Sequence, residues 1–423
     1  MKDRADTALL ERARDIASHF EIPAPLEVGD FTGKGNINQH TYLVTAGPSG
    51  NRRQFLLQLL NPGIFTRPHA VMNGMISCIR AQEKALSKRA LRGVEWETIR
   101  LVPTRNGKDY LEMKGTSGTE CWRMMVRIVD AFTFRSLQEI KEPATRIRVA
   151  EQAGRGLALF GLLTAAMDPS SVDNALPGYR DTELYYSQLF SVLAGARTAS
   201  EAERYLPSDP VVRESTRQHF LIRLDSAEYR RRLEDFQLRR FLGLAIEQKS
   251  FGLSLARKLR SGELRRVVVH GDTKLDNFLF STRTGEVKAL VDLDTIMAHT
   301  WLSDWGDMVR SLVNVAGERE EDSGRIDVDH EVFTALAKGY LDTAGTTDSR
   351  ELELMVDAPQ IMALELGVRF LADYLRGDSY FQLRTGDPPD LNKTRAMVQF
   401  CLFERLRSKA DLARQTIKSL QHE

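Results

Sequence analysis

The sequence has little cysteine and no excess charge of either sign. Its 59 Lys and Arg residues balance 58 Asp and Glu residues, which leaves a formal net charge of +1. This balance argues against a strongly basic nucleic-acid-binding surface and against an acidic tail. The three cysteines, Cys78, Cys121 and Cys401, are too scattered for a disulfide framework or a spaced zinc site. We expect them to be buried free thiols in a protein of the reducing cytosol.

Long hydrophobic runs are absent as well. No stretch approaches the roughly 18 apolar residues that a membrane-spanning helix needs. The first 20 residues contain acids and have no continuous apolar core, so we expect no signal peptide. Leu9, Ala13, Ile16 and Phe20 recur there at helical spacing and predict an amphipathic helix. We therefore predict a soluble, cytoplasmic protein with neither a membrane nor a nucleic-acid partner.

What the chain does contain is material for a large core. It has 423 residues, of which 42% are hydrophobic, and this length predicts more than one structural unit. Residues 26–61 are typical of three strands separated by a glycine loop and a turn, residues 70–90 of a helix and residues 98–130 of short strands. From about residue 145 helical patterns dominate, apart from a return of strand character in residues 267–294.

This order predicts an α+β fold in two lobes. We expect a small β-rich N-terminal lobe over residues 1–130 and a large helical C-terminal lobe over residues 131–423. Residues 183–265 are rich in Arg, Glu and Leu at helical spacing, so we expect them to form packed helices.

The residues that can carry chemistry concentrate in residues 267–294. There a Val-Val-Val run leads into His-Gly-Asp-Thr-Lys-Leu-Asp-Asn, and a second strand ends in Val-Asp-Leu-Asp. With a hairpin tip at the intervening Thr-Gly pair, Asn277 falls directly opposite Asp292. An amide oxygen and a carboxylate at that separation can share a hard cation such as Mg²⁺. Asp294 lies two residues further on, so it is expected on the same face as Asp292.

The loop HGDTKLDN followed by LVDLD resembles the catalytic loop and metal turn of the protein-kinase-like phosphotransferases. The resemblance extends to GKGNINQHTYLV, LPGYRDTELYY, DWGDMVRS and GVRFLADYLRGDSYF, and it covers most of the chain except about 183–265. Within the aminoglycoside phosphotransferase and choline kinase superfamily, the chain is most similar to the N-acetylhexosamine 1-kinases. The resemblance implies a bilobal protein-kinase-like fold and an ATP-dependent, Mg²⁺-using kinase that phosphorylates a hydroxyl group of a small molecule.

The resemblance also implies roles for the residues of this loop. Asp272 would be the catalytic base that accepts the proton of the acceptor hydroxyl. Lys274 would offset the charge that spreads over the transferring phosphoryl group. Asn277 and Asp292 would hold Mg²⁺, with Asp294 as a further candidate ligand.

The nucleotide site is expected on the N-terminal lobe. Gly33, Lys34, Gly35 and Asn36 resemble the loop that covers the phosphates, where glycines let backbone amides approach phosphate oxygens closely. The resemblance places the adenine against the backbone of the connection between the lobes, at Arg127, Ile128 and Val129. Together with the loop residues, Arg127, Val129 and Gln58 of the third strand are the expected nucleotide contacts.

One position departs from kinases in general. Their third strand carries a lysine to the α- and β-phosphates, where it pairs with a helix glutamate. This chain has Gln58 there, which can donate a hydrogen bond but brings no charge. We hypothesise that Lys34 or Lys274 supplies the missing positive charge. Glu83 is the nearest counterpart of the helix glutamate.

The phosphoryl acceptor is expected near a late helix. Glu365, Arg369, Asp373 and Arg376 alternate in sign at helical spacing, a pattern that by itself predicts a solvent-exposed ladder of ion pairs. Similarity to the hexosamine kinases implies instead that Arg369 and Tyr380 face a sugar, beside the catalytic Asp.

Two further segments are interpreted as structural. His270 is expected to orient the catalytic loop through hydrogen bonds, and the turn Asp304–Asp307 to cap the helix that follows it. Ser311 stands where the sugar kinases can have an aromatic residue, which weakens the claim to the same sugar.

The function predicted from the sequence is phosphorylation of the anomeric hydroxyl of an N-acetylhexosamine or a related sugar, which gives a sugar 1-phosphate. Two alternatives stay open at this point. The same chemistry could act on an aminoglycoside, an amino alcohol or an amino acid. Because Gln58 is neutral, a non-catalytic nucleotide-binding protein is the second alternative.

Overall fold

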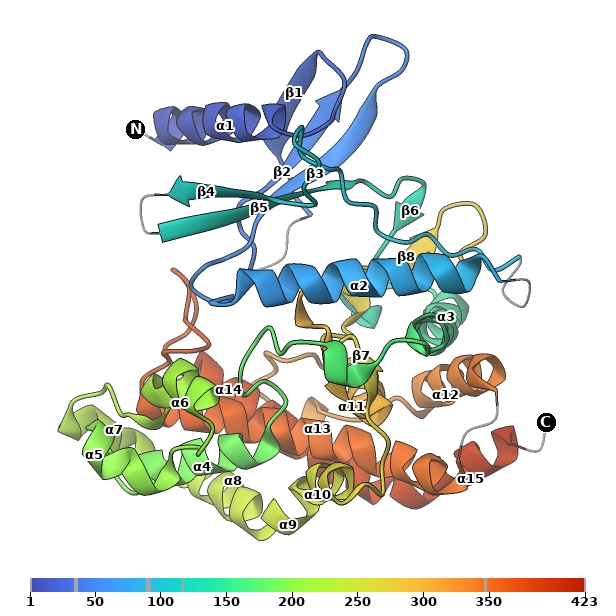
Figure 1. Cartoon of the computed structure of the whole chain (residues 1–423). Coiled ribbons are helices and arrows are strands. Elements are labelled where there is room, and N and C mark those ends of the chain that lie inside the picture. The colour runs from blue at the N-terminus through green and yellow to red at the C-terminus, as the bar shows by residue number, and fades with distance from the viewer. Residues whose placement is uncertain (1, 34–36, 89–92, 116–117, 346–347, 422–423) are drawn as a thin grey trace.

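The structure is a computed structural model that describes residues 2–33, 37–88, 93–115, 118–345 and 348–421. It has two lobes, with a β-sheet at one end and a large body of helices at the other (Figure 1). The expectation of a bilobal α+β fold is therefore confirmed. No helix within the described ranges is long and apolar enough to cross a membrane.

The N-terminal lobe is built on one antiparallel sheet. Its five strands lie in the order β1-β2-β3-β5-β4. Alternate side chains of β3 and β5 face a core of their own, in which Phe55 and Leu57 pack with Trp122 and Met124. The strands are β1 (Leu26–Asp30), β2 (Thr41–Ala46), β3 (Arg53–Leu59), β4 (Leu111–Gly115) and β5 (Gly118–Val126).

The predicted first helix is α1 (Lys2–Ser18), which lies beside the sheet. Ala13, Ile16 and Phe20 are buried in the core of the sheet, as their spacing predicts. Leu9 is 40% exposed, so its inclusion in the apolar face was wrong. The reason is that the neighbouring Leu10, and not Leu9, lies on the apolar face of α1, where it is partly buried against the same core.

Helix α2 (Pro68–Leu86) lies between the sheet and the helical lobe (Figure 1). Its residues Val71, Met75 and Cys78 are buried in the same large core as residues of the C-terminal lobe. Gly74 faces Ile296, and a Cβ added to it would make an ordinary van der Waals contact with that side chain at 3.7 Å. Helix α2 therefore links the sheet to the segment in which the metal ligands are predicted.

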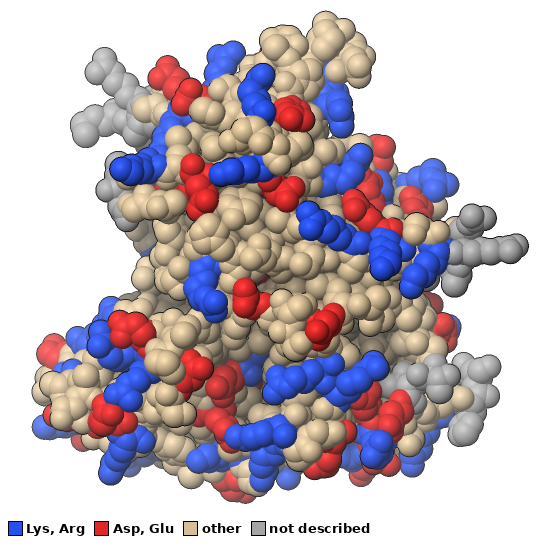
Figure 2. All heavy atoms as spheres, viewed as in Figure 1, with Lys and Arg blue, Asp and Glu red and all other residues tan. Residues whose placement is uncertain are grey.

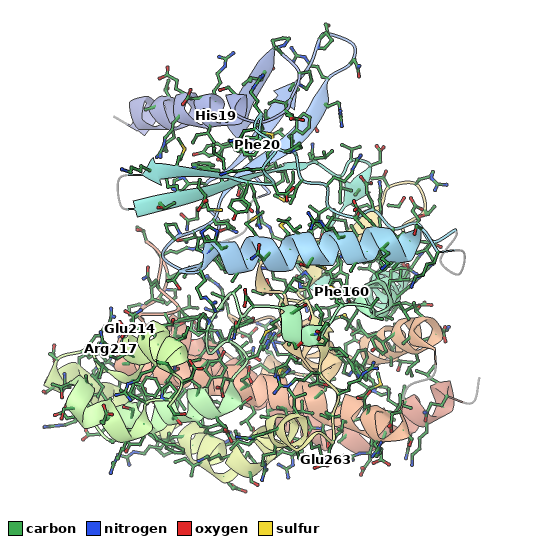
Figure 3. All side chains as sticks on the ribbon, viewed as in Figure 1. His19, Phe20, Phe160, Glu214, Arg217 and Glu263 are labelled. Carbon is green, nitrogen blue, oxygen red and sulfur yellow. The ribbon has the colours of Figure 1, made fainter. Side chains whose placement is uncertain are left out.

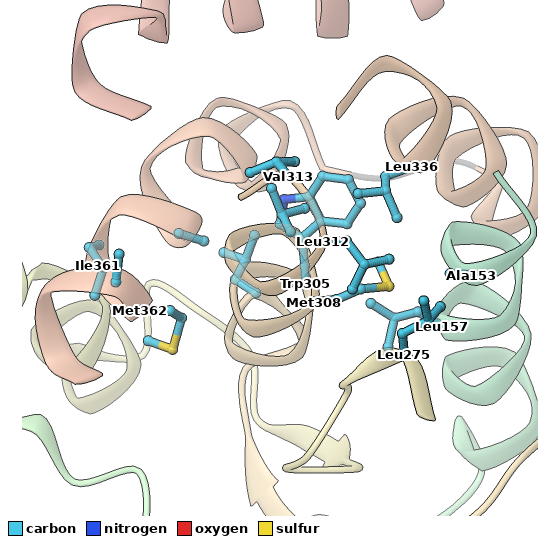
Figure 4. Packing of buried hydrophobic residues seen from close by; sticks show 14 of the residues in the cluster. Ala153, Leu157, Leu275, Trp305, Met308, Leu312, Val313, Leu336, Ile361 and Met362 are labelled. Atoms are coloured by element: carbon cyan, nitrogen blue, oxygen red, sulfur yellow. The ribbon is translucent and has the colours of Figure 1, made fainter. Parts of the chain in front are cut away.

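The C-terminal lobe contains the long helices that form most of the core. Figure 4 shows how Trp305 and Met308 of α11 pack with Leu336 of α12 and with Leu157 of α3. The long helices are α3 (Pro143–Thr164), α11 (Trp301–Leu312), α12 (His330–Ala344), α13 (Ser349–Arg376), α14 (Leu391–Ser408) and α15 (Ala410–Leu420).

Helices α11 and α13 approach each other unusually closely. A Cβ added to Gly306 would lie 2.7 Å from the carbonyl oxygen of Ala358, so this crossing requires glycine. Pro359 has no N–H to bond the carbonyl oxygen of Met355 within α13. That oxygen accepts a hydrogen bond from Nε1 of Trp305 at 2.8 Å instead. The crossing fixes α11, which carries two buried aspartates next to the predicted catalytic loop.

Residues 183–265 form helices, as predicted. They pack along α13 and α14 at one side of the C-terminal lobe (Figure 1). The helices of this part are α4 (Thr182–Leu193), α5 (Ala199–Ala202), α6 (Pro210–Thr216), α7 (Ser226–Leu233), α8 (Phe236–Glu247), α9 (Lys249–Gly252) and α10 (Ser254–Ser261), with the 3-10 turns η4 (Glu203–Tyr205) and η5 (Arg217–Phe220).

The surface has no extended patch of one charge on the face drawn in Figure 2, where basic and acidic side chains are interspersed over the helical lobe. This distribution agrees with the net charge of +1. All three cysteines are buried and free, as their number and spacing predict.

Candidate active site

The candidate site lies on short strands and turns between the lobes. Strand β7 (Val267–Val269) leads into residues 270–274, the turn η6 (Leu275–Asn277) follows, and a hairpin returns the chain to the turn η7 (Leu293–Thr295). The strands that complete this region are β6 (Ala131–Phe132), β8 (Phe278–Ser281), β9 (Val287–Leu290) and β10 (Met297–His299).

The pairing of this hairpin differs from the predicted one. Phe278 pairs with Leu290, and the register shifts between Leu279 and Phe280. Because of this bulge, Asn277 meets Val291, whose N–H donates to its carbonyl oxygen at 2.9 Å. The prediction that Asn277 lies directly opposite Asp292 was therefore wrong by one residue.

Asp292 nevertheless has an unusual backbone conformation, which sets the direction of its side chain. Its φ is +67°, in the left-handed region that side chains other than glycine rarely adopt. Non-glycine residues held in this region concentrate at functional sites. The extended strand that the sequence predicted beyond Asp292 is replaced by η7, so Asp294 points into the protein interior and not along the same face.

Asp272 has one engaged and one available oxygen. Its Oδ2 accepts from Nζ of Lys274 at 3.0 Å and from Nδ2 of Asn277 at 3.2 Å. Within the part of the chain that the structure describes, Oδ1 has no protein donor. The Asp272 side chain is 27% exposed. Because Oδ2 holds the carboxylate in place, the available Oδ1 can accept the proton of an approaching hydroxyl group.

Lys274 stays charged in this setting. Burial opposes its charge, but the carboxylates of Asp272, Asp276 and Asp292 outweigh that effect and raise the pKa of the ammonium group. Its side chain is 38% exposed, so it can turn from Asp272 to a ligand.

The carboxylates near η7 carry more negative charge than the local cations offset. Burial and, to a smaller extent, the nearby carboxylates of Asp294 and Asp272 together raise the pKa of Asp292 to about 7. A hard cation between Asp292 and the amide oxygen of Asn277 would relieve this repulsion, and those two donors are of the kind that Mg²⁺ prefers. No group of three or more His, Cys, Asp or Glu side chains in the described ranges could hold a metal by itself. The residues thus fit Mg²⁺ with phosphate oxygens and water as its remaining ligands.

Asp294 is bound by two residues of the N-terminal lobe. Its Oδ1 pairs with Nη1 of Arg123 at 2.5 Å, and its Oδ2 accepts from Nδ2 of Asn38 at 2.7 Å. Sequence reasoning missed both Arg123 and Asn38. Arg123 could have been noticed as a lone charge in the apolar strand Cys121–Val126.

Buried polar groups hold the catalytic loop from behind. The backbone N–H groups of His270 and Gly271 donate to Asp304 at 2.6 and 2.9 Å, and the His270 ring contacts the carbonyl oxygen of Val291 at 2.9 Å. Phe160 of α3, labelled in Figure 3, packs edge-on against His270 with ring centroids 5.6 Å apart. His270 therefore orients the loop, in agreement with its interpretation as structural.

The prediction that Asp304–Asp307 caps a helix was wrong. These residues lie inside α11, and the residue that caps it is Thr300, whose side chain accepts from the N–H of Leu302. Asp304 instead accepts from the two buried N–H groups of His270 and Gly271 in the catalytic loop, and Asp307 pairs with Arg180 at 2.6 Å. Arg180 in turn donates to the carbonyl oxygen of Gly271 at 3.0 Å.

The predicted nucleotide contacts lie on the N-terminal lobe. Gly33 is described, but Lys34, Gly35 and Asn36 fall outside the described residues. Gln58 lies on β3, where its Oε1 accepts from Nη2 of Arg123 at 2.5 Å and its Nε2 donates to Thr41 at 2.9 Å.

The connection between the lobes follows β5 directly. Arg127 bonds Gln54 through its backbone N–H at 3.0 Å and through its side chain. The carbonyl oxygen of Val129 accepts from Nζ of Lys288 at 2.9 Å, and the Val129 side chain is exposed. Glu83 is exposed on the outer side of α2 beside Arg80, and Met75 is the α2 residue that contacts Arg123. The structure thus gives no support to Glu83 as the counterpart of the helix glutamate.

The predicted acceptor residues form an aromatic cage. The guanidinium of Arg369 lies 4.7 Å from the ring centroid of Tyr185 and 5.5 Å from those of Tyr179 and Tyr380. Phe381 closes the cage at 5.3 Å. Tyr179 donates to the carbonyl oxygen of Gly271 at 2.8 Å, so the cage adjoins the residue before Asp272. Sequence reasoning found Arg369 and Tyr380 but did not single out Tyr179, which precedes α4, or Tyr185, which lies in its first turns.

The rest of the charged stripe on α13 is buried and not solvent-exposed. Glu365, Asp373 and Arg376 are each 3% exposed or less. Arg376 pairs with Asp373 at 2.6 Å, and Glu365 accepts from Thr182 of α4 at 2.6 Å. The reason is that residues 182–193 and 377–381 cover this side of the helix.

A family model described as the phosphotransferase enzyme family matches residues 32–351. The chain belongs to this family. Among solved structures it is similar to the microcompartment-associated aminopropanol kinase, at 14% identity and a TM-score of 0.56 over 95% of this chain and 98% of that one. It also resembles the Plasmodium vivax ethanolamine kinase, at 11% identity and a TM-score of 0.44 over 88% and 81% of the two chains. A glucosamine kinase in complex with glucosamine, ADP and inorganic phosphate matches at 14% identity and a TM-score of 0.40 over 92% and 80%.

Membership of this family confirms the prediction of an enzyme that transfers a phosphoryl group to an alcohol group. The aminopropanol kinase likeness confirms the kinase-like fold. Among the predicted residues of this phosphotransferase, the structure brings together Asp272, Lys274, Asn277 and Asp292, and it places Arg369 beside the same loop through Tyr179.

Proposed function

We propose that this phosphotransferase moves the γ-phosphoryl group of ATP to a hydroxyl group of a neutral sugar. The preferred acceptor is the anomeric hydroxyl of an N-acetylhexosamine or a related hexose, with a sugar 1-phosphate as product. The observation that carries the choice of acceptor is the Arg369 cage next to the catalytic loop. We propose that the enzyme acts in the cytoplasm.

The cage favours a neutral acceptor for electrostatic reasons. Among the described residues, no carboxylate forms an ion pair with Arg369, and aromatic faces surround its guanidinium. Burial of this unpaired positive charge disfavours an ammonium group nearby, as an amino alcohol or an aminoglycoside would bring. The N–H groups of Arg369 can instead donate hydrogen bonds to hydroxyl and acetamido oxygens. The rings of Tyr179 and Tyr380 can pack against the apolar face of a sugar.

The chain's own residues supply positioning and proton transfer. In this proposal the acceptor hydroxyl donates to the available Oδ1 of Asp272, which takes the proton as the acceptor oxygen bonds to the γ-phosphorus and the bond from that phosphorus to the leaving ADP oxygen breaks. Lys274 moves its ammonium group to the transferring phosphoryl group. Asn277 and Asp292 would hold Mg²⁺, which neutralises charge on the phosphates of ATP. The backbone near Gly33 and at Arg127–Val129 would bind the nucleotide.

A second candidate is phosphorylation of an amino alcohol. It is favoured by the fold likeness to an aminopropanol kinase. The two are separated by measuring ADP release with N-acetylglucosamine, N-acetylgalactosamine, glucose, 1-amino-2-propanol, ethanolamine, choline and kanamycin. Turnover of a free N-acetylhexosamine or of glucose with a phosphatase-labile, acid-labile 1-phosphate product supports the proposal. Turnover of an amine without any turnover of a free sugar overturns it.

A further inference from the structure

The missing lysine of the third strand leaves open which group provides its charge. In the sheet, Gln58 of β3 pairs directly with Arg123 of β5. Residues paired in this way have side chains on the same face, with Cβ atoms about 4.5–5.5 Å apart. Both Nε and Nη2 of Arg123 donate to Oε1 of Gln58, at 3.0 and 2.5 Å. A guanidinium therefore sits at the position that the lysine of other kinases would reach.

The other end of this guanidinium reaches the metal turn. Nη1 of Arg123 contacts Oδ1 of Asp294 at 2.5 Å and Sδ of Met75 in α2 at 3.2 Å. Arg123 and Asp294 are each 2% exposed. The second oxygen of Asp294 accepts from Asn38 at 2.7 Å. Asp294 is thus fixed from the N-terminal lobe on both oxygens, two residues after Asp292.

Gln58 is also part of this connection. Its Nε2 donates to Oγ1 of Thr41 at 2.9 Å, and Thr41 donates to the carbonyl oxygen of Asn38 at 2.7 Å. The amide therefore accepts from Arg123 on one side and donates toward the nucleotide-covering loop on the other. A lysine at position 58 could not accept from Arg123, and it would place two cations together in a buried site.

We propose that Arg123 is the positioning residue that carries, on the fifth strand, the positive charge which other kinases carry on the third. It acts through Asp294 and Gln58, because its buried guanidinium has no direct path to solvent. By holding Asp294 it fixes the turn that presents Asp292 to the nucleotide-bound metal. This inference rests on the proposed function only in requiring that the chain binds nucleotide. It assigns the missing positive charge to Arg123 and no longer to Lys34 or Lys274.

The test is a charge exchange between the two strands. Four proteins are compared with the wild type: Arg123→Gln, Gln58→Lys, the double variant with both substitutions, and Arg52→Gln. Arg52 precedes β3 and pairs with Glu27 at the exposed surface, so it is a matched control for loss of an arginine in this lobe. The readouts are the Kd of ADP with Mg²⁺ by calorimetry, the thermal midpoint of nucleotide-free protein, and KM for ATP against KM for the acceptor.

We expect Arg123→Gln and Gln58→Lys each to weaken ADP·Mg²⁺ binding by about 10- to 100-fold, the usual effect of losing a group that orients a metal ligand. KM for ATP should rise in parallel while KM for the acceptor stays within about twofold, since Arg123 does not touch the acceptor cage. The double variant restores one cation and one amide to the pair, so it should regain at least about tenfold of the lost affinity. Arg52→Gln should bind as the wild type does.

The outcomes separate the two proposals. A wild-type chain that binds no ADP overturns the proposed function and this assignment with it. If the wild type binds ADP and the Arg123→Gln variant binds it equally well, the role of Arg123 is overturned but the proposed function is not. The same conclusion follows if the loss of ADP affinity in the double variant is the sum of the losses in the two single variants. If Arg123→Gln fails to fold, the double variant and Arg123→Lys are compared directly with the wild type. A folded double variant that binds ADP within tenfold supports the assignment, and a folded one that does not bind overturns it.

Discussion

Two clusters of charged side chains lie on opposite sides of the catalytic loop and differ in how completely their charges are paired. The acidic cluster comprises the partly exposed Asp272, Lys274 and Asp292 and the buried Asp294, and it contains more carboxylates than local cations. The arginine cluster, Arg180, Asp307, Arg310 and Glu365, lies behind the loop. Asp307 accepts from the buried guanidinium groups of Arg180 and Arg310, and Glu365 forms an ion pair with Arg180 at 3.7 Å.

The pKa values of the two clusters move in opposite directions. Burial raises the pKa of Asp292, and its carboxylate neighbours add to this effect. Burial acts on Asp307 in the same direction, but Arg180 and Arg310 outweigh it and hold the pKa of Asp307 well below its ordinary range. The comparison teaches that unbalanced charge marks the part of the site that receives a ligand, whereas complete pairing marks the scaffold that holds it.

The largest effect is expected in the acidic cluster. Asp272→Asn removes the proposed base but keeps an oxygen for Lys274, so kcat should fall by about 10²- to 10⁴-fold with little change in the thermal midpoint. Asp276→Asn, a neighbouring carboxylate outside the proposed machinery, is the matched control and should keep activity within a few fold. Steady-state assays and thermal scans of both proteins check this. An Asp272→Asn enzyme that is nearly as active as the wild type would contradict the assignment of the base.

The arginine cluster should respond in stability. Arg180→Met leaves Asp307 and Glu365 without one buried cation, so the free energy of unfolding should fall by about 3–5 kcal/mol. Urea denaturation measures this loss. Replacing Asp307 by Leu in the same chain should recover part of it, because an apolar pair avoids the uncompensated charge. A single variant as stable as the wild type would show that the pairing is not structural.

Arg369 belongs to neither cluster, and its replacement tests what the cage recognises. Arg369→Met should raise KM for the acceptor by about 10- to 100-fold, the value of a hydrogen bond from a charged group, with KM for ATP unchanged. Arg384→Met, at an exposed arginine of the following segment, is the matched control. Initial rates at varied acceptor and varied ATP distinguish the two constants. A rise in KM for ATP alone would remove Arg369 from the acceptor site.

Much of the catalytic loop could be predicted because its residues are close in sequence. Asp272, Lys274 and Asn277 lie on one short loop, so their spacing nearly determines their geometry. The register of the hairpin could not be predicted, because the bulge at Leu279 and Phe280 depends on how the two strands pack and not on the turn alone. The one-residue shift moved Asp292 from its predicted partner without removing it from the site.

The contacts that link distant segments were not predictable. Arg123 reaches Asp294 only because α2 is inserted between β3 and β5 and the strands then pair with Gln58 opposite Arg123. Similarly, the spacing on α13 indicates an ion-pair ladder, and only the packing of α4 over it shows that Glu365 is buried against Thr182. In both cases the sequence carries the residue types, while the tertiary fold decides their partners.

The comparison can be sharpened by pH. Asp304 is buried like Asp307, but no cation among the described residues forms a hydrogen bond to its carboxylate. Burial raises the pKa of Asp304 to about 6, although the N–H groups of Gly271 and His270 oppose this. Its folded-state pKa exceeds the unfolded value, so its stabilising contribution is fully present at low pH and is lost as pH rises toward 6.

We therefore expect the difference in unfolding free energy between the wild type and Asp304→Asn to shrink by on the order of 2 kcal/mol between pH 4.5 and 7. Over the same range the difference for Asp307→Asn should stay constant, because the pKa of Asp307 is lowered and it remains ionised throughout. Urea denaturation at several pH values gives both curves. A wild-type advantage over Asp304→Asn that grows with pH would reverse the assignment.

The smallest effect is expected at an ion pair with similar nitrogen–oxygen distances but a different environment. Arg260 contacts both oxygens of Glu183 at 2.8 and 2.6 Å, close to the distances by which Arg310 holds Asp307. The Arg260 side chain is 58% exposed, however, against 10% for Arg310. Water and salt screen the exposed pair, so Arg260→Gln should leave the thermal midpoint unchanged within the precision of the scan, at low and at high salt. The corresponding Arg310→Gln variant should be clearly destabilised, because Asp307 would stay buried with less compensation. Equal losses of stability at the two sites would show that burial does not decide how much these ion pairs stabilise the fold. The distinction between the arginine cluster as scaffold and the acidic cluster as ligand site would then be unsupported.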